Sequence, residues 1–203
     1  MSLRRSLTLC TAALLLALSA RGDAFQPQVV DAAGDAPTPS RDIMYALFEN
    51  YVHPADGDTL QITLGLNAMP VQGEPATYSV AFEHGDCGGG RVAYDWQGGG
   101  VAAPLTGTAT KASFWTCDVT VDAAGESVYA YTEHTITVTW LEGALQFWVP
   151  LKVAGLTYGT TLSATRACSG QSFFRATTDL RRRTGIDCSI DSSPRGESYV
   201  IGS

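Results

Sequence analysis

The sequence predicts an all-β protein, an antiparallel β-sandwich of about eight or nine strands. Apolar residues recur at every second position through most of the chain, which is typical of strands with one buried face. Turn signals that contain glycine separate these runs. No run is followed by a long helical pattern, so the sequence does not favour a parallel α/β sheet. A disulfide-stapled excursion from the sandwich is expected near the C-terminus.

The alternating runs place the strands along the chain. They lie at 60–66, 78–82, 92–96, 115–121, 136–140 and 145–149. Hairpin-like turns are expected at 56–58, 124–126 and 142–143. The parity of each run predicts that Trp96, Trp115 and Trp140 lie in the core, whereas Phe114 is out of step with Trp115 and is expected to face outward.

The N-terminus has the pattern of a signal peptide over residues 1–24. Arg4 and Arg5 precede an apolar run at 7–18, and small residues follow it. An uncleaved N-terminal anchor is the alternative. Residues 25–41 are expected to form a loop and linker that leads into the first strand, and 42–203 the β-sandwich domain. The sequence therefore predicts a secreted or cell-surface protein.

Composition and charge narrow the classes of partner. Of the 203 residues, 45% are hydrophobic and 16% charged, a globular composition. The 13 basic and 20 acidic side chains give a net charge of −7, which argues against binding nucleic acid. No membrane-spanning segment is expected beyond the N-terminal run. The length fits one domain with a sizeable core.

The cysteines support export. Cys10 falls in the predicted signal peptide, and Cys87, Cys117, Cys168 and Cys188 remain. An even number in an exported chain predicts two disulfides. We expect Cys87 to pair with Cys117 and Cys168 with Cys188, because these pairs close the shortest loops, although the other pairings stay open. The spacing does not suggest a zinc site.

Three segments resemble a known group of domains. They are "VVDAAGDAPTPSRDIMYALFENY" at 29–51, "LQFWVPLKVAGLTYGTTLSATRA" at 145–167 and "YVIG" at 199–202. Together they resemble exported bacterial and archaeal β-sandwich domains with an Asp-x-x-Gly-Asp opening, similar to family-nine carbohydrate-binding modules and DOMON-like domains. The resemblance covers nearly the whole chain after the signal peptide. It implies a β-sandwich, and a calcium site in the first loop that pins the first strand.

Asp31, Asp35 and Asp42 are the candidate metal ligands. Carboxylates separated by small residues and a glycine can surround a hard cation, and calcium takes six to eight oxygen ligands. The expected role of such a calcium ion is structural. The alternative is that these side chains form Asx turns and cap the strand by accepting hydrogen bonds from backbone N–H groups.

Trp148, Tyr129 and Tyr131 are the candidate ligand-binding residues. Each has the parity opposite to the apolar residues beside it, so each is expected to face away from its own sheet's core. Exposed rings can stack on the C–H faces of sugars, which suggests carbohydrate as the ligand. The alternative is that a second layer or a loop covers them.

No pattern singles out a catalytic site. The chain has three histidines and neither a Gly-x-Ser-x-Gly nor a His-Glu-x-x-His motif. We therefore expect a non-catalytic binding module, with a polysaccharide as the candidate ligand. The alternative is a structural or interaction domain of the cell envelope that binds another protein and no sugar.

Overall fold

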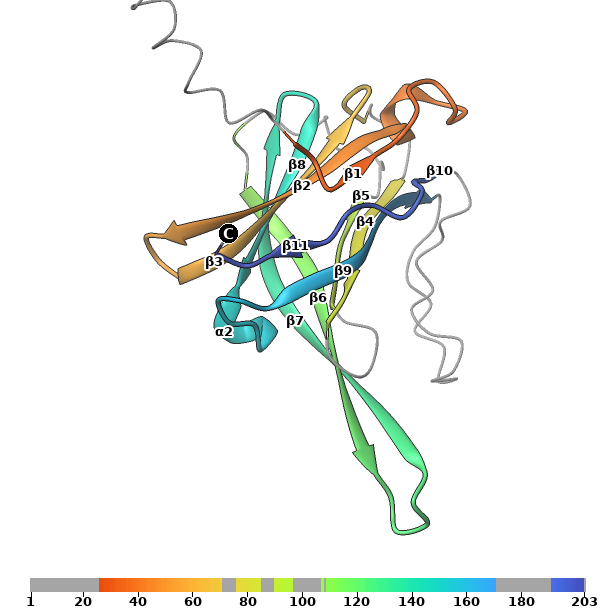
Figure 1. Cartoon of the computed structure of the whole chain (residues 1–203). Coiled ribbons are helices and arrows are strands. Elements are labelled where there is room, and N and C mark those ends of the chain that lie inside the picture. Colours follow the sequence, from red (N-terminus) through yellow and green to blue (C-terminus); the bar gives the residue numbers. More distant parts are fainter. Residues whose placement is uncertain are drawn as a thin grey trace, which may run out of the picture.

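The computed structural model describes residues 26–70, 76–84, 90–96, 107, 109–170 and 191–202 (Figure 1). Within these ranges it does not describe the side chains of Asp95, Trp96, Cys117, Asp118, Tyr129 and Tyr131. The predicted signal peptide and most of the predicted excursion, residues 171–190, lie outside the described residues.

The described residues form an all-β structure, as predicted. Its strands are β1 (Val29–Val30), β2 (Ile43–His53), β3 (Gly57–Leu66), β4 (Ala76–Glu83), β5 (Gly90–Trp96), β6 (Ala109–Val121), β7 (Ser127–Leu141), β8 (Ala144–Pro150), β9 (Thr161–Gly170), β10 (Asp191–Ser192) and β11 (Tyr199–Val200). A 3₁₀ turn, η1 (Pro39–Arg41), precedes β2, and one helical turn, α2 (Leu151–Ala154), follows β8. The predicted eight or nine strands are too few, because β1, β10 and β11 have only two residues each and show no alternation.

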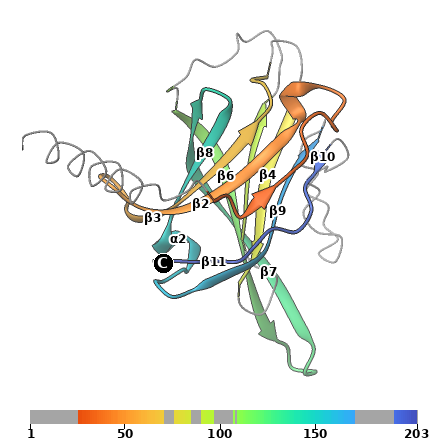
Figure 2. The ribbon, with the colours of Figure 1, turned by 45° about the horizontal axis from the view of Figure 1, so that its top comes forward.

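The strands pair antiparallel in one continuous sheet. Its order is β1-β2-β3-β8-β7-β6-β5-β4-β9-β10, and β11 pairs with β9 off this path. The sheet curls, so that its first and last strands come near each other (Figures 1 and 2). The result is sandwich-like, with inner faces that enclose one core.

All three predicted turns are present. Gly57 opens β3 directly after a turn, and Gly125 and Gly143 lie in the turns before β7 and β8; their φ angles are 73°, 81° and 70°. Glycine suits this left-handed conformation because it has no Cβ to clash with the backbone. The turn between β7 and β8 has only two residues, Glu142 and Gly143, since Leu141 pairs with Ala144.

The core is rich in aromatic rings that the curled sheet surrounds. Trp140 is fully buried, as predicted, and meets Tyr94 edge-on at 5.4 Å between ring centroids. Phe48 meets Phe82 in the same manner at 6.0 Å. Other large and fully buried side chains are Tyr78, Phe114, Phe147, Ile43, Leu60, Ile62, Leu64, Leu145 and Leu162.

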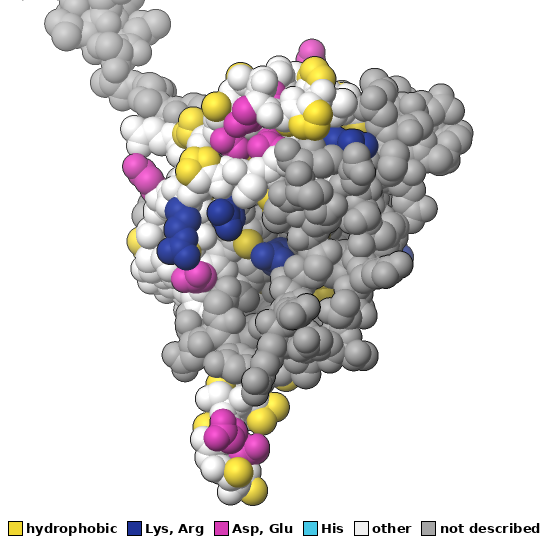
Figure 3. All heavy atoms as spheres, turned by 90° about the vertical axis from the view of Figure 1, so that its right-hand side faces the viewer, with side chains coloured by type: hydrophobic (Ala, Val, Ile, Leu, Met, Phe, Trp, Pro, Cys, Tyr) yellow, Lys and Arg dark blue, Asp and Glu magenta, His cyan; other side chains and the backbone are white. Residues whose placement is uncertain are grey.

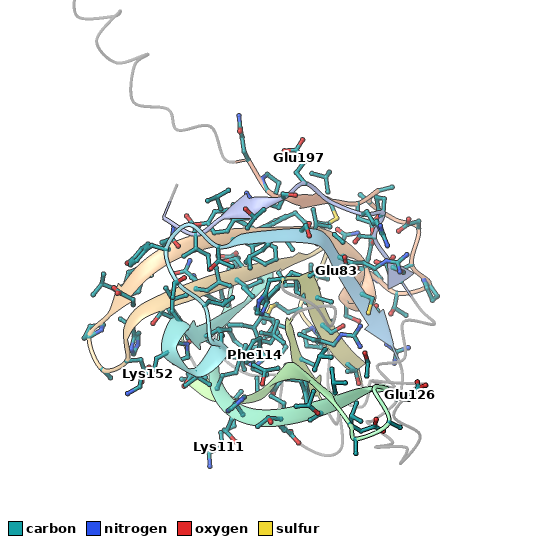
Figure 4. The ribbon with its side chains drawn as sticks, turned by 60° about the horizontal axis from the view of Figure 1, so that its bottom comes forward. Glu83, Lys111, Phe114, Glu126, Lys152 and Glu197 are labelled. Atoms are coloured by element: carbon teal, nitrogen blue, oxygen red, sulfur yellow. The ribbon has the colours of Figure 1, made fainter. Side chains whose placement is uncertain are left out.

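The parity predicted for β6 is wrong. Phe114 lies in the main core, where Figure 4 shows it inside the curled sheet while Lys111 of the same strand points outward. Trp115 instead packs on the outer face with Ala93 and Cys168. Both faces of this strand bury apolar side chains, so alternation alone could not tell which face is inner. The side chain of Trp96 is outside the described part.

The C-terminal segment joins the two ends of the curled sheet. Residues 193–197, which we call the strap, run between β9 and the chain just before β1 (Figure 2). The Gly196 N–H donates to the Thr165 carbonyl oxygen at 2.8 Å, and the Glu197 N–H donates to that of Gln28 at 2.6 Å. The strap therefore bridges the gap that the open sheet leaves.

A β-hairpin projects from the body. In the described chain, β6 pairs with β5 only up to Trp115, and β7 pairs with β8 only from Thr137 onward. Residues 116–132, which we call the arm, extend beyond these pairings (Figure 1). Figure 3 shows acidic and hydrophobic side chains at its tip, where Val121 is 68% exposed.

Cys168 is the one cysteine whose side chain the structure describes. It is disulfide-bonded, and its Sγ lies 3.0 Å from the Ser79 Oγ. The side chains of Cys87, Cys117 and Cys188 are outside the described part, so the pairing stays a prediction. None of the described helices has the length and apolar character needed to cross a membrane.

Candidate functional site

The loop between β1 and β2 is anchored at both ends. The Asp31 N–H donates to the Met44 carbonyl oxygen at 3.0 Å, which continues the pairing of β1 with β2. At the other end, the Asn67 N–H donates to the Asp42 carbonyl oxygen at 2.9 Å. Gly34 makes the turn between them, with a φ angle of 84°. Backbone hydrogen bonds therefore hold both ends of this loop without the help of a ligand.

β10 brings a fourth carboxylate to this loop from the far end of the chain. Asp191 pairs with Ser169 of β9, and the Ser169 hydroxyl donates to the Arg41 carbonyl oxygen at 2.6 Å. This contact holds the end of β9 against η1. Asp191 consequently reaches the start of β2, where its Oδ2 accepts a hydrogen bond from the Ile43 N–H at 2.6 Å.

Three carboxylates converge at this point. One oxygen from each of Asp35, Asp42 and Asp191 lies within 4.8 Å of the other two, and we call these residues the acidic cluster. Asp42 is 1% exposed and Asp191 7%, whereas Asp35 is exposed. The structure thus brings together two of the three predicted ligands. Asp31 lies close enough to interact with the cluster through its charge.

Within the described part of the chain, the hydrogen bonds of Asp42 and Asp31 leave one oxygen of each without a partner. The Asp42 Oδ2 accepts from the Gly34 N–H at 2.7 Å and from the Asn67 Nδ2 at 2.8 Å, but its buried Oδ1 accepts none. The Asp31 Oδ1 accepts from the Ala32 N–H at 3.0 Å, and its buried Oδ2 accepts none. Turn and capping contacts account for the bonded oxygens and leave the other two unexplained.

Burial and repulsion from neighbouring carboxylates raise the pKa of Asp191 and of Asp31. Burial raises the pKa of Asp191, the Ile43 N–H opposes this, and the charges of Asp31 and Asp35 raise it further. Burial likewise raises the pKa of Asp31, in part offset by its bond from Ala32. A cation among the carboxylates would remove this repulsion. The donor atoms of the acidic cluster are all oxygens, which suits a hard cation such as Ca²⁺ rather than zinc.

A second group of side chains lies on the outer face of the sheet. The ring centroid of Trp148 lies 5.1 Å from that of Tyr51 and 5.4 Å from that of His53. The Trp148 Nε1–H donates to the Thr139 hydroxyl at 3.1 Å. We call Tyr51, His53 and Trp148 the outer aromatic cluster. Trp148 therefore faces away from the core, as its parity predicts.

The register of the sheet explains why these rings meet. Trp148 of β8 lies opposite Gln61 of β3, and Gln61 lies opposite Glu49 of β2. Tyr51 is two residues beyond Glu49 on the same face, and its ring reaches that of Trp148 across β3. The Gln61 Nε2 donates to the Glu49 Oε2 at 2.9 Å, which places an amide and a carboxylate beside the rings.

Tyr129 and Tyr131 do not belong to the outer aromatic cluster. Trp148 pairs with Thr137 of β7, whereas Tyr131 pairs with Cys117 in the arm. Six residues along one strand span roughly 20 Å, so the three predicted ligand-binding residues do not form one group. The side chains of both tyrosines are outside the described part. Sequence reasoning missed Tyr51 and His53, whose own strand shows no regular alternation.

The histidines lie on separate elements. The His53 Nδ1 is 3.0 Å from an Asp56 carboxylate oxygen, and the His134 Nε2 is 3.3 Å from the Thr116 hydroxyl. His84 follows β4, and burial lowers its pKa. The absence of catalysis stays a prediction.

Comparison with family models, with curated proteins and with solved structures finds no match for this chain.

Proposed function

We propose that the chain is a secreted, non-catalytic binding module that binds carbohydrate on the outer face of its sheet. The observation that supports this most is the position of Trp148 in the outer aromatic cluster, beside a tyrosine that is 44% exposed. Large rings on a solvent-facing sheet can pack against the C–H face of a sugar. The signal-peptide pattern at 1–24 supports the secreted location.

The polar neighbours of the rings suit a ligand rich in hydroxyl groups. Glu49 and Gln61 lie in the row that leads to Trp148, and both can exchange hydrogen bonds with hydroxyls. The ring planes of Tyr51 and His53 are inclined to that of Trp148 by 63° and 49°. Because the rings are not coplanar, we propose a single oligosaccharide chain as the ligand rather than the flat surface of a crystalline polymer.

A structural calcium ion is part of the same proposal. Asp35 and Asp42 would hold it, and the unpartnered Oδ1 of Asp42 supports this assignment. The cation would supply charge compensation in the loop before β2 and no chemistry at the outer aromatic cluster.

The proposal is tested by retention on a panel of polysaccharides and by titration with soluble oligosaccharides in the presence of calcium. Trp148→Ala is expected to weaken binding at least tenfold, or about 1.4 kcal/mol. Tyr158→Ala is the matched control, because it removes a ring that is 56% exposed and outside the cluster. Equal binding by the wild type and Trp148→Ala contradicts the proposed site, and no binding to any polymer contradicts the carbohydrate ligand.

The alternative is a protein-interaction domain of the cell envelope. The arm favours it, because Val121 and Val128 are exposed there and the outer edges of both strands pair with no other described strand. Such edges can accept a strand from another chain. If no polysaccharide binds, crosslinking and co-purification with Val121→Asp as the comparison would test this second function.

A further inference from the structure

We propose that Asp191 completes a Ca²⁺ site with Asp42 and Asp35, and that the cation fastens the two ends of the curled sheet to each other. This inference rests on the calcium part of the proposed function and is independent of the carbohydrate ligand. Its new elements are the ligand from β10 and the role of the cation as a clasp between distant parts of the chain.

The ligands come from opposite ends of the sheet. Asp42 directly precedes β2, which pairs with the terminal strand β1, whereas Asp191 opens β10 at the other terminus of the strand order. In the sequence, Asp191 and Ile43 are 148 residues apart, yet they share a hydrogen bond. A cation that binds Asp42 and Asp191 together therefore connects the sheet across its open side.

The unpartnered Oδ1 of Asp42 is evidence for a bound ligand that does not depend on how many acidic residues lie nearby. Asp42 is almost fully buried, and a carboxylate oxygen that is buried without a partner is costly. The Oδ1 belongs to a carboxylate whose other oxygen is fixed by Gly34 and Asn67. A contact that orients a carboxylate through one oxygen and frees the other is a common arrangement around bound metals.

The spacing of the oxygens fits calcium. Ca²⁺–O distances of about 2.3–2.6 Å allow two ligand oxygens on opposite sides of the ion to be roughly 4.6–5.2 Å apart. All three carboxylates of the acidic cluster meet this limit, because one oxygen from each lies within 4.8 Å of one oxygen from each of the other two. Ca²⁺ takes six to eight oxygens, so backbone carbonyl groups and water would supply the rest.

The strap extends the effect of the clasp along the C-terminal segment. It begins directly after β10, where the Ser193 N–H donates to the Ala167 carbonyl oxygen at 3.0 Å. Its far end, at Glu197, bonds to the Gln28 carbonyl oxygen just before β1. A cation at Asp191 thus fixes one end of a segment whose other end already contacts the N-terminal part of the sheet, and both segments are expected to become ordered together.

The first test is calorimetric titration of the chelator-treated full chain with CaCl₂, and with MgCl₂ for comparison. We expect one strong Ca²⁺ site, a thermal midpoint raised by about 5 °C or more at saturating Ca²⁺, and at least tenfold weaker binding in Asp191→Asn. Glu126→Gln, at the exposed tip of the arm, is the control and should bind as the wild type does (Figure 4). Unchanged affinity in Asp191→Asn would overturn the proposal.

The second test uses only the wild type, so it does not depend on how a variant folds. Hydrogen exchange is compared in Ca²⁺ and in chelator. The clasp predicts that 26–42 and 191–202 gain protection together. Protection confined to 26–42 would leave a calcium site in the first loop and overturn the clasp. If the wild type binds no Ca²⁺ at all, both the clasp and the calcium part of the proposed function are wrong.

Discussion

At the scale of single residues, Asp42 shows how one side chain serves two purposes. One carboxylate oxygen organises the loop before β2, and the other lies buried without a partner. In Asp42→Asn, the amide oxygen can still accept from Gly34, and the loss of the negative charge removes the repulsion between Asp42 and Asp31. We therefore expect Asp42→Asn to stabilise the protein slightly in chelator, by about 1 kcal/mol, and to destabilise it in Ca²⁺. Thermal melts under both conditions test this reversal of sign, and a loss of stability in both would contradict it.

His84 carries a prediction about pH. Burial lowers its pKa in the folded protein, whereas the unfolded chain has the ordinary value of about 6.5. The unfolded state therefore binds more protons, so the contribution of His84 to stability is complete above pH 6.5 and is lost as the pH falls through that value. We expect the melting temperature of the wild type to fall more than that of His84→Gln between pH 7 and pH 5. Parallel curves for the two proteins would contradict this.

The sequence was informative about residues where the signal is local. Asp35 and Asp42 stand in one loop with Gly34 directly before Asp35, and their spacing suggested a shared site. Asp191 has no such signal, because it reaches the acidic cluster only through its pairing with Ser169 and the bond from Ser169 to Arg41. Tyr51 and His53 were missed for a similar reason, since cross-strand register decides that they meet Trp148.

At the scale of elements, the strap shows how closely two segments approach. A Cβ at Gly196 would lie 2.1 Å from the carbonyl oxygen of Gln28 and 2.6 Å from the Thr165 Oγ1. The carbonyl oxygen of Gln28 belongs to the backbone, so it cannot rotate away as the end of a flexible side chain could. We expect Gly196→Ala to lower the free energy of unfolding by about 2 kcal/mol, because the strap must move off β9 or off the chain before β1.

Chemical denaturation measures this effect, with Glu197→Ala as the control. The Glu197 side chain is exposed and points away from the contacts of the strap (Figure 4). Glu197→Ala therefore keeps the backbone groups that form the hydrogen bonds of the strap. Equal stability of Gly196→Ala and Glu197→Ala would contradict the packing described here.

The elements that could be predicted are those whose own side chains alternate. β3, β4, β7 and β8 carry apolar residues at every second position, and a glycine marks the start of β3, β7 and β8. The two-residue strands β1, β10 and β11 form because a neighbouring strand pairs with each of them. Their own sequences are too short to show the alternation that predicts a strand. In β6 alternation was present but misleading, since Trp115 and Phe114 are both buried on opposite faces.

At the scale of the whole molecule, the fold class followed from the sequence but the closure of the sheet did not. Antiparallel pairing and short turns are encoded locally, which is why an all-β protein could be predicted. The closure depends on the strap and on β10, whose contacts join residues more than a hundred positions apart. Such contacts have no periodic signature.

The arm lies apart from the core, so it can be altered without changing the core. This allows the two candidate functions to be distinguished by experiment. The core residues of β6 and β7 lie outside the arm, at Ala112, Phe114, Ile136, Val138 and Trp140. Deleting 118–121 and 127–130 would shorten the arm by four residues on each strand. Successive side chains of a strand alternate between its two faces, so removing an even number leaves every remaining side chain on its native face. The native turn would also be kept.

We expect this shortened protein to melt cooperatively within about 5 °C of the wild type, since no residue of the main core is removed. If the outer aromatic cluster binds carbohydrate, oligosaccharide affinity should be unchanged, because Trp148 and its neighbours are intact. If the arm is instead the site for a protein partner, the shortened protein should lose co-purification of that partner while keeping its fold. A loss of cooperative unfolding would show that the arm contributes to the stability of the body, contrary to the division argued here.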